Sequence, residues 1–378
     1  MASSYKMADL LRFMVQRGSS DLILKAGRPP MFRVLGDLLP LSDLLERPTP
    51  PVSDEDVREM GYSIAREEQI QRFENDFELD LAYELKGVSR YRVNFFQQRG
   101  AMGVAVRAIP FKINTVEELG LPPAVIQFAD RPRGLVLVTG PTGSGKSTTL
   151  AALINYVNRT RAEHIITVED PVEFIHEDLE SLINQREIGE DTHSFANALK
   201  SALREDPDVI LIGEMRDLET MEMAITSAET GHLVFGTLHT TDAVQTVDRI
   251  IDAFPVFQQQ QIRLQMAANL VGVVSQTLLK RSDQTKRVAA YEVMVCTSAV
   301  RSNIREGKTH QIGSLISVGS RHGMRTLNQH LAELVAHEVC NRLDAIDKSP
   351  YPDELGHMIE QAREEREKQL ALEKKQRR

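Results

Sequence analysis

The sequence predicts an α/β protein in which a parallel-sheet domain follows a smaller α+β domain. Three observations lead to this prediction. From about residue 130, short apolar runs alternate with helical patterns, which favours parallel strands joined by right-handed crossovers. A glycine-rich stretch, GPTGSGKST, lies between the first of these runs and a helical pattern. Before residue 110, apolar residues instead recur with the period of two that is typical of an antiparallel sheet.

Composition limits the classes of protein that the chain can represent. Its 378 residues suggest two or three domains, and its formal net charge of −9 gives no overall basic field, so we expect no nucleic-acid partner. The two cysteines, Cys296 and Cys340, have no CxxC spacing and fit a reducing compartment. The N-terminal stretch reads as an amphipathic helix and not as a signal peptide, and no apolar run reaches membrane-spanning length. We therefore expect a cytosolic protein.

Residues 1–109 form the predicted α+β domain. A helix near 7–17 precedes DLILKAGRPPMFRVLGD, in which two short strands flank a Gly/Pro turn. Residues 46–51 are expected to form a loop, and residues 54–74 one or two helices. This domain thus begins with mixed helices and strands.

A β-hairpin is predicted to complete the first domain. Its first strand, DFELDLAYEL, has these apolar residues on one face: Phe77, Leu79, Leu81, Tyr83 and Leu85. After a turn at Lys86 and Gly87, SRYRVNFF alternates again, with Tyr91, Val93 and Phe95 on one face. Arg90 and Arg92 therefore project together from the polar face of the hairpin.

A connection at 110–115 leads to the second predicted domain, 116–350. Its expected strands are LVLVT, HIITVED, DVILIG and HLVFGTLHT, and its expected helices include FANALKSALRE and LETMEMAITSAET. Residues 254–350 read as predominantly helical. The charged segment 351–378 reads as a solvated helix or a frayed tail.

The stretch GPTGSGKST matches the phosphate-binding motif GxxxxGK[ST] in its required position between a strand and a helix. Its glycines allow successive backbone N–H groups to wrap phosphates at a helix N-terminus. Lys146 would supply charge to the β- and γ-phosphates, and the Ser147 hydroxyl would ligate Mg²⁺. We therefore expect ATP and Mg²⁺ as cofactors. The predicted nucleotide-binding residues are Gly140, Thr142, Gly143, Ser144, Gly145, Lys146, Ser147 and Thr148.

Acidic residues follow two of the predicted strands. ITVEDPVEFIHE places Glu169, Asp170 and Glu173 at a carboxyl strand end, where ligands of open α/β sheets bind. VILIGEMRD ends in Gly213 and Glu214, whereas the metal-organising strand of a P-loop protein is expected to end in Asp. From the residues alone, two interpretations remain: a strand that is only buried core, or acidic chemistry that is distributed differently.

Two histidines flank the strand in ETGHLVFGTLHTTDA. His232 precedes the apolar run and His239 follows it. A histidine at a strand end is most often a structural hydrogen-bonding group. His239 is nevertheless the candidate for a functional role.

The phosphate loop, EDPVEF, ILIGEMRD and TGHLVFGTLHTT occur in this order and resemble the secretion-type AAA-like ATPases. Within that superfamily, the chain resembles the twitching-motility pilus retraction ATPases, the PilT type. The resemblance covers roughly residues 5–345 and includes SSDLILKAGRPPMFRVLGDL and RYRVNFFQQRG. It implies a RecA-like P-loop ATPase core and a smaller N-terminal PAS-like α+β domain.

The resemblance also implies roles for the site residues. In this family the strand characteristically ends in Gly-Glu, so Glu214 would help to organise Mg²⁺ and its waters, and the base-like group maps to Glu169. This division suits phosphoryl transfer, which demands mainly the positioning of water and metal. His239 belongs to the family's histidine box. Arginines from the adjacent subunit's N-terminal domain complete the site in family members, and the matching residues are Arg92 and Arg107.

The function implied by the resemblance is that of a homo-hexameric, Mg²⁺-dependent motor ATPase for type IV pilus retraction. Such a protein would be cytoplasmic and peripheral at the inner face of the bacterial inner membrane. Its partners would be the polytopic pilus platform protein and, as a further candidate, a second retraction ATPase.

Other functions remain open. One is an accessory retraction ATPase that depends on a main motor. Another is a pilus assembly or type II secretion ATPase, although such proteins usually carry a four-cysteine zinc module that two cysteines cannot form. A nucleotide-gated scaffold and a nucleic-acid translocase are the remaining alternatives.

Overall fold

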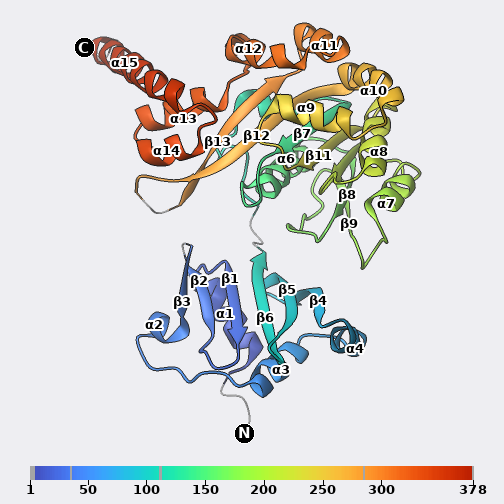
Figure 1. Cartoon of the computed structure of the whole chain (residues 1–378), viewed down its shortest axis with the longest axis vertical. Helices are drawn as coiled ribbons and strands as arrows, with labels where there is room; N and C mark the ends of the chain where they lie inside the picture. The colour runs from blue at the N-terminus through green and yellow to red at the C-terminus, as the bar shows by residue number, and fades with distance from the viewer. Residues whose placement is uncertain (1–4, 35, 110–112, 284–285, 377–378) are drawn as a thin grey trace. The chain divides into compact units, whose positions relative to one another are not determined.

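The computed structural model describes residues 5–34, 36–109, 113–283 and 286–376, and it divides into two compact units, 1–112 and 113–378 (Figure 1). Each unit is described by itself. The predicted connection at 110–115 falls partly outside the described residues.

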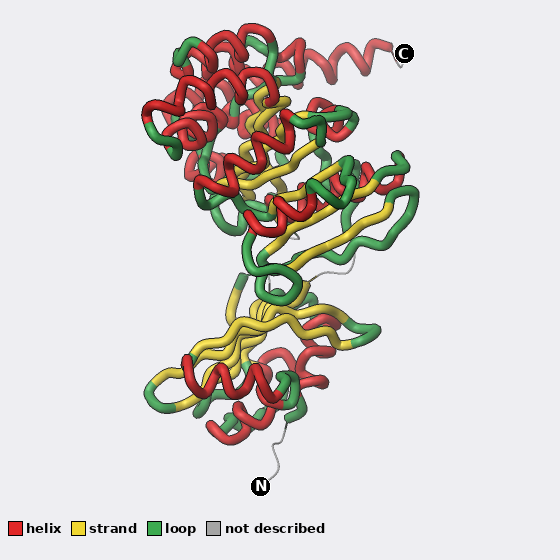
Figure 2. The backbone as a smooth tube through the Cα atoms, turned by 90° about the vertical axis from the view of Figure 1, so that its right-hand side faces the viewer, coloured by secondary structure: helices red, strands yellow, loops and turns green. Residues whose placement is uncertain are grey.

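The first unit contains a six-stranded antiparallel sheet in the order β3-β2-β1-β6-β5-β4. Its elements are α1 (Met7–Gln16), β1 (Asp21–Lys25), β2 (Met31–Val34), β3 (Asp37–Pro40), α2 (Leu41–Leu45), α3 (Asp54–Tyr62), α4 (Glu67–Asp76), β4 (Glu78–Leu85), β5 (Ser89–Gln98) and β6 (Ala101–Ile109). Figure 2 shows the helices gathered on one face of this sheet. The core between them contains Leu11 of α1, Phe73 of α4 and Phe95 of β5, all fully buried.

The predicted hairpin is formed by β4 and β5, and Tyr91, Val93 and Phe95 are buried as expected. The prediction was wrong for Phe77. This residue ends α4 with a left-handed φ of 63°, donates its N–H to the carbonyl oxygen of Phe73 and remains 54% exposed. The strand therefore begins at Glu78, two residues after the start of the predicted stretch, because the backbone must first leave the helix.

The second unit is built on a seven-stranded sheet in the order β13-β12-β7-β11-β10-β8-β9. The predicted strands are confirmed as β7 (Gly134–Thr139), β8 (His164–Glu169), β10 (Val209–Ile212) and β11 (Leu233–Leu238), and they pair in parallel. The helices that follow them are α6 (Lys146–Thr160), α7 (Phe195–Ala202), α8 (Leu218–Glu229) and α9 (Ala243–Asp252).

Helices cover both faces of this sheet. Leu135 and Leu137 of β7 pack on the face covered by α7, α8 and α9, whereas Val136 and Val138 pack on the opposite face with α6 and α5 (Pro123–Ala129). Burial on both faces explains why these strands read as continuous apolar runs.

The prediction that 254–350 is predominantly helical missed two long strands. After α10 (Val256–Asn269), β12 (Leu270–Lys280) pairs in parallel with β7, and β13 (Arg287–Val295) pairs antiparallel with β12. Most of β12 is buried, so LVGVVSQTLLK shows no alternation of apolar and polar residues, and periodicity alone does not distinguish such a run from a buried helix. The short edge strand β9 (Leu182–Glu187) was also missed.

Helices form the C-terminal part of the unit. They are α11 (Ser298–Arg305), α12 (Ile312–Ser317), α13 (Leu327–Ala336), α14 (Arg342–Lys348) and α15 (Pro352–Gln376), with 3-10 turns at Thr309–Gln311 and Ser320–His322. Leu355 and Ile359 anchor the first turns of α15 in an apolar cluster with α13, so the predicted charged tail is a helix that is packed at its start. Among the described helices, none combines the length and apolar character needed to cross a bilayer.

Candidate active site

The phosphate loop joins β7 to α6, and its glycines occupy conformations that other residues avoid. Gly140, Gly143 and Gly145 have φ values of +140°, +79° and +90°. Gly145 is the N-cap of α6 and makes no side-chain cap, so the first N–H groups of this helix are left to a ligand or to solvent. This arrangement suits an anion at the helix N-terminus. Thr142 and Gly143 are exposed at the tip of the loop.

Lys146 folds over the loop. Its Nζ donates to the carbonyl oxygen of Gly140 at 2.8 Å and to that of Pro141 at 3.3 Å. Burial lowers the pKa of Lys146, while the charges of Glu214 and Glu173 oppose this shift. The ammonium group is thus partly desolvated, and within the described residues its hydrogen bonds go to neutral oxygens of the loop. A phosphate would offer it a charged partner, so the residues present fit a nucleotide phosphate.

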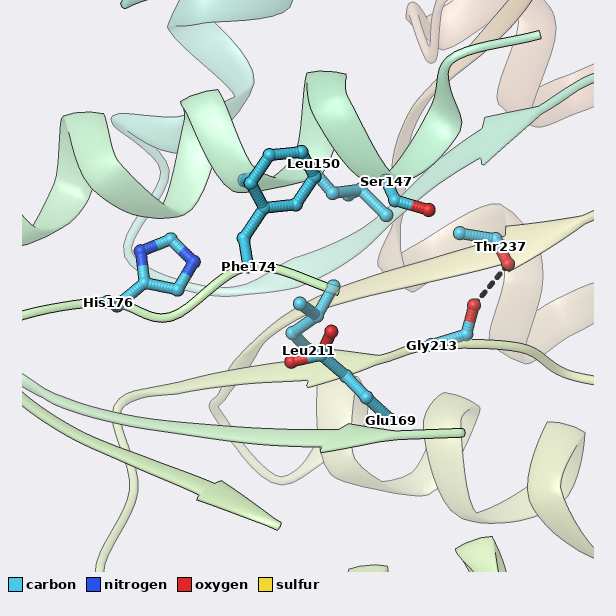
Figure 3. Close-up of a pocket in the computed structure, with 9 residues that line it drawn as sticks. Ser147, Leu150, Glu169, Phe174, His176, Leu211, Gly213 and Thr237 are labelled. Atoms are coloured by element: carbon cyan, nitrogen blue, oxygen red, sulfur yellow. Dashed lines mark hydrogen bonds between the residues drawn. The ribbon is translucent and has the colours of Figure 1, made fainter. Parts of the chain in front are cut away.

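A small cavity of about 30 Å³ adjoins the loop (Figure 3). It is lined by Ser147, Leu150, Ala151, Glu169, Phe174, His176, Leu211, Gly213 and Thr237. The structure therefore brings Ser147, the expected metal-binding hydroxyl, and Glu169, the expected base, to the same space. These residues come from the start of α6 and the end of β8.

Glu169 is buried and well supported by hydrogen bonds. Its Oε1 accepts from Thr167 Oγ1 at 2.8 Å and from Gln185 Nε2 at 3.2 Å, and its Oε2 accepts from the Glu173 N–H at 3.3 Å. Burial raises the pKa of Glu169, although these three hydrogen bonds oppose the shift. A carboxylate with a raised pKa accepts a proton more readily than an ordinary one.

Gly213 allows β10 and β8 to approach closely where both strands end. Its N–H donates to the carbonyl oxygen of Val168 at 2.8 Å, and a Cβ at this position would lie 3.2 Å from the Cα of Glu169. The carbonyl oxygen of Gly213 accepts a hydrogen bond from Thr237. Close packing thus accounts for the glycine that replaces the usual Asp.

Glu214 follows Gly213 and is held by a guanidinium group and an imidazole ring. Its Oε1 lies 2.6 Å from Arg216 Nε and 2.9 Å from His239 Nε2. Burial alone would raise the pKa of Glu214, but the hydrogen bonds and charges of Arg216 and His239 hold it below its usual value. Glu214 therefore remains an anion, and the structure brings the predicted residues Glu214 and His239 into direct contact.

Arg92 and Arg107 lie in the first unit, directly opposite each other on β5 and β6. Arg107 Nε is 2.9 Å from Asp21 Oδ1, and Arg92 Nε is 3.9 Å from Asp80 Oδ1. The side chain of Arg107 is 67% exposed, and that of Arg92 is 44% exposed. The two predicted guanidinium groups thus form a neighbouring pair on the polar side of the sheet.

Reasoning from the sequence missed two residues of this region. Arg216 lies within the quoted stretch GEMRD, but no role was assigned to it. Gln276 of β12 donates from Nε2 to the carbonyl oxygen of Ser144 in the phosphate loop, at 2.7 Å. The available signal was a polar Ser-Gln pair inside the apolar run LVGVVSQTLLK, because a polar group in a buried strand needs a hydrogen-bond partner.

Comparisons with known proteins agree with this fold. Residues 90–314 match the family described as Type II/IV secretion system protein. The chain is 49% identical to the type IV pilus retraction ATPase PilT of Pseudomonas aeruginosa, over 92% of this chain and 99% of that protein. It is 40% identical to the type IV pilus ATPase PilU of the same organism, over 93% of this chain and 90% of that protein.

Among solved structures, the pilus retraction motor PilT with bound ADP matches with a TM-score of 0.85 and 45% identity, over 94% of this chain and 100% of that chain. This match confirms the predicted fold, a RecA-like P-loop core with a smaller PAS-like N-terminal domain. The chain therefore belongs to the PilT type of pilus retraction ATPases, within the family of type II/IV secretion proteins.

Proposed function

We propose that this protein is the motor ATPase that drives type IV pilus retraction. It would act as a homo-hexamer in the cytoplasm, peripheral to the inner membrane, with the pilus platform protein as its partner. The observation that carries the proposal is the phosphate loop with Glu169 and Glu214 beside it, in a chain 49% identical to PilT along nearly its whole length.

ATP would be bound through its phosphates by the loop glycines, by the N-terminal amides of α6 and by Lys146. The bound nucleotide would bring Mg²⁺, which supplies charge neutralisation at the phosphates. Ser147 and Glu214 would hold the metal, Ser147 directly and Glu214 through ordered water. Among the described residues, no group of three or more His, Cys, Asp or Glu side chains is placed to hold a metal ion.

The chain's own residues would perform the remaining steps of hydrolysis. Glu169, with its raised pKa, would orient the attacking water and accept its proton. Glu214, held by Arg216 and His239, would keep a fixed negative charge. Arg92 and Arg107 of an adjacent subunit would stabilise charge on the γ-phosphate. Release of the phosphate would then weaken the contacts between subunits, which would move as rigid bodies.

Deletion of the gene tests the direction of the motor. A strain that lacks the protein is expected to carry surplus pili and to lose twitching, because assembled pili are no longer withdrawn. Pilus counts by electron microscopy and twitching zones on agar measure both effects. Absent pili would indicate an assembly motor and contradict the proposal.

A second candidate is an accessory retraction ATPase, since the chain is also 40% identical to a second type IV pilus ATPase, PilU, of the organism that carries PilT. Where the genome encodes a second chain of this type, single and double deletions separate the two functions. Deleting an accessory protein should have no further effect in a strain that already lacks the main motor. Deleting it alone should leave partial retraction.

Arg92→Ala is expected to abolish most of the ATPase activity of the homogeneous assembly while preserving each subunit's own phosphate loop. Mixing Arg92→Ala with Lys146→Ala subunits should then restore part of the activity. In such mixtures one variant supplies an intact nucleotide pocket and the other supplies an intact arginine. Steady-state phosphate release across a series of mixing ratios measures the recovery.

Arg72→Ala is the matched control, since Arg72 is an exposed arginine of the same unit, paired with Asp76 at 3.6 Å. It should retain full turnover. Full turnover in Arg92→Ala itself would contradict the proposed role of Arg92. Mixtures that recover no ATPase activity would contradict it as well.

A further inference from the structure

A buried amide group lies directly behind the phosphate loop. Gln276 of β12 is 3% exposed. Its Nε2 donates to the carbonyl oxygen of Ser144 at 2.7 Å, and its Oε1 accepts from Thr149 Oγ1 at 2.9 Å. One side chain thus joins the loop to the first turns of α6. Ser144 and Thr149 are themselves buried, so both hydrogen bonds are shielded from water.

The backbone of Gln276 also shapes the loop. A Cβ at Gly140 would lie 2.3 Å from the carbonyl oxygen of Gln276, and a Cβ at Gly145 would lie 3.2 Å from Gln276 Nε2. Gly140 is therefore required by the approach of the β12 backbone as well as by its own φ value, and Gly145 packs closely against the amide of Gln276. The loop is packed around this one residue.

The chemistry of the partners fixes the orientation of the amide. The carbonyl oxygen of Ser144 can only accept a hydrogen bond, so the NH₂ group of Gln276 must face it. Oε1 then faces Thr149, whose hydroxyl donates. A glutamine side chain is long enough to reach both partners and supplies one donor and one acceptor, whereas an ionised glutamate would supply two acceptors.

We propose that Gln276 is a positioning residue for nucleotide binding, which holds the phosphate loop in the shape that receives the phosphates. The inference rests on the proposed ATPase function. A loop held in this shape before binding does not lose conformational freedom when ATP arrives, and this preorganisation strengthens affinity. Without the amide, the affinities for ATP and ADP should fall together, because the loop receives phosphates that both nucleotides carry.

Gln276→Leu removes both hydrogen bonds at similar side-chain volume. We expect the Kd values for ATP and ADP, measured by calorimetry on the full-length protein, to rise roughly tenfold or more, as for a buried polar group left without its partner. The KM for ATP should rise in parallel, while kcat at saturating ATP changes much less. This split distinguishes a positioning role from a general loss of active protein.

Asn328→Leu is the control for stability alone. Asn328 is a buried amide of α13 that donates to the carbonyl oxygen of Tyr351 at 2.9 Å and accepts from Ser349 Oγ at 2.7 Å. Its replacement removes two hydrogen bonds of the same kind away from the phosphate loop. It should lower the melting temperature and leave nucleotide affinity unchanged.

Gln276→Glu gives a signature in the pH profile. The ionised carboxylate would set an oxygen against the carbonyl oxygen of Ser144, so affinity should be weak at neutral or alkaline pH. In acid the protonated carboxyl group can donate again, and affinity should approach that of the wild type at the same pH. A merely structural role predicts no such recovery.

Unchanged nucleotide affinity in Gln276→Leu would overturn the inference, as would an equal loss of affinity in Asn328→Leu or a flat pH profile in Gln276→Glu. A wild-type protein that binds neither ATP nor ADP would instead overturn the proposed function itself. The two failures are therefore distinguishable.

Discussion

Lys146→Ala is expected to abolish nucleotide binding, with the Kd for ATP rising on the order of 100-fold or more, because truncating one partner of a buried charged pair costs about 2–5 kcal/mol. In the free protein, Lys146 donates to two carbonyl oxygens of the loop, and burial lowers its pKa. Glu214 and Glu173 act on Lys146 through their charges but form no ion pair with it among the described residues, so the variant should fold about as stably as the wild type without nucleotide.

Two measurements check this expectation. Calorimetric titration gives the affinity, and thermal unfolding with and without ATP gives the rise in melting temperature that a ligand of the folded state produces. Lys200→Ala is the control, since Lys200 is exposed and pairs with Glu219 at 2.5 Å on the protein surface. A Lys146→Ala protein that is still stabilised by ATP to the full extent would contradict the assignment.

The conformation of the phosphate loop between β7 and α6 was predictable because its residues are close in the sequence. Gly140, Lys146 and Ser147 belong to one nine-residue stretch, and the strand and helix around it fix the geometry. Glu169 and Glu214 were also predictable, since parallel strands place their carboxyl ends at one edge of the sheet. Their individual roles came from the resemblance and not from spacing.

The rest depended on contacts between distant segments. Gln276 meets the loop only because β12 pairs with β7, and the buried run of β12 carries no periodic signal that marks it as a strand. Phe77 illustrates a local limit of the same approach. Its apolar character fitted the strand pattern, but the end of α4 turned the backbone left-handed at that residue.

Glu169→Gln and Glu214→Gln are each expected to leave ATP binding nearly intact and to lower the rate of hydrolysis by roughly 100-fold or more, the range typical of a lost general base or electrostatic group. Single-turnover assays with saturating protein separate the chemical step from binding and product release. Glu222→Gln, a replacement at an exposed carboxylate of α8, is the control and should show normal rates. Normal turnover in either variant would remove that residue from the mechanism.

The two variants should also lose activity in different ways, because the surroundings of the two carboxylates shift their pKa values in opposite directions. Burial raises the pKa of Glu169, as suits a group that accepts a proton, whereas Arg216 and His239 overcome the effect of burial and hold the pKa of Glu214 low, as suits a fixed charge near a metal. Glu214→Gln should therefore need more Mg²⁺ for its half-maximal residual rate, and Glu169→Gln should need no more than the wild type. Equal Mg²⁺ requirements in the two variants would mean that Glu214 does not act through the metal, because the loss of its charge would then leave the metal's affinity unchanged.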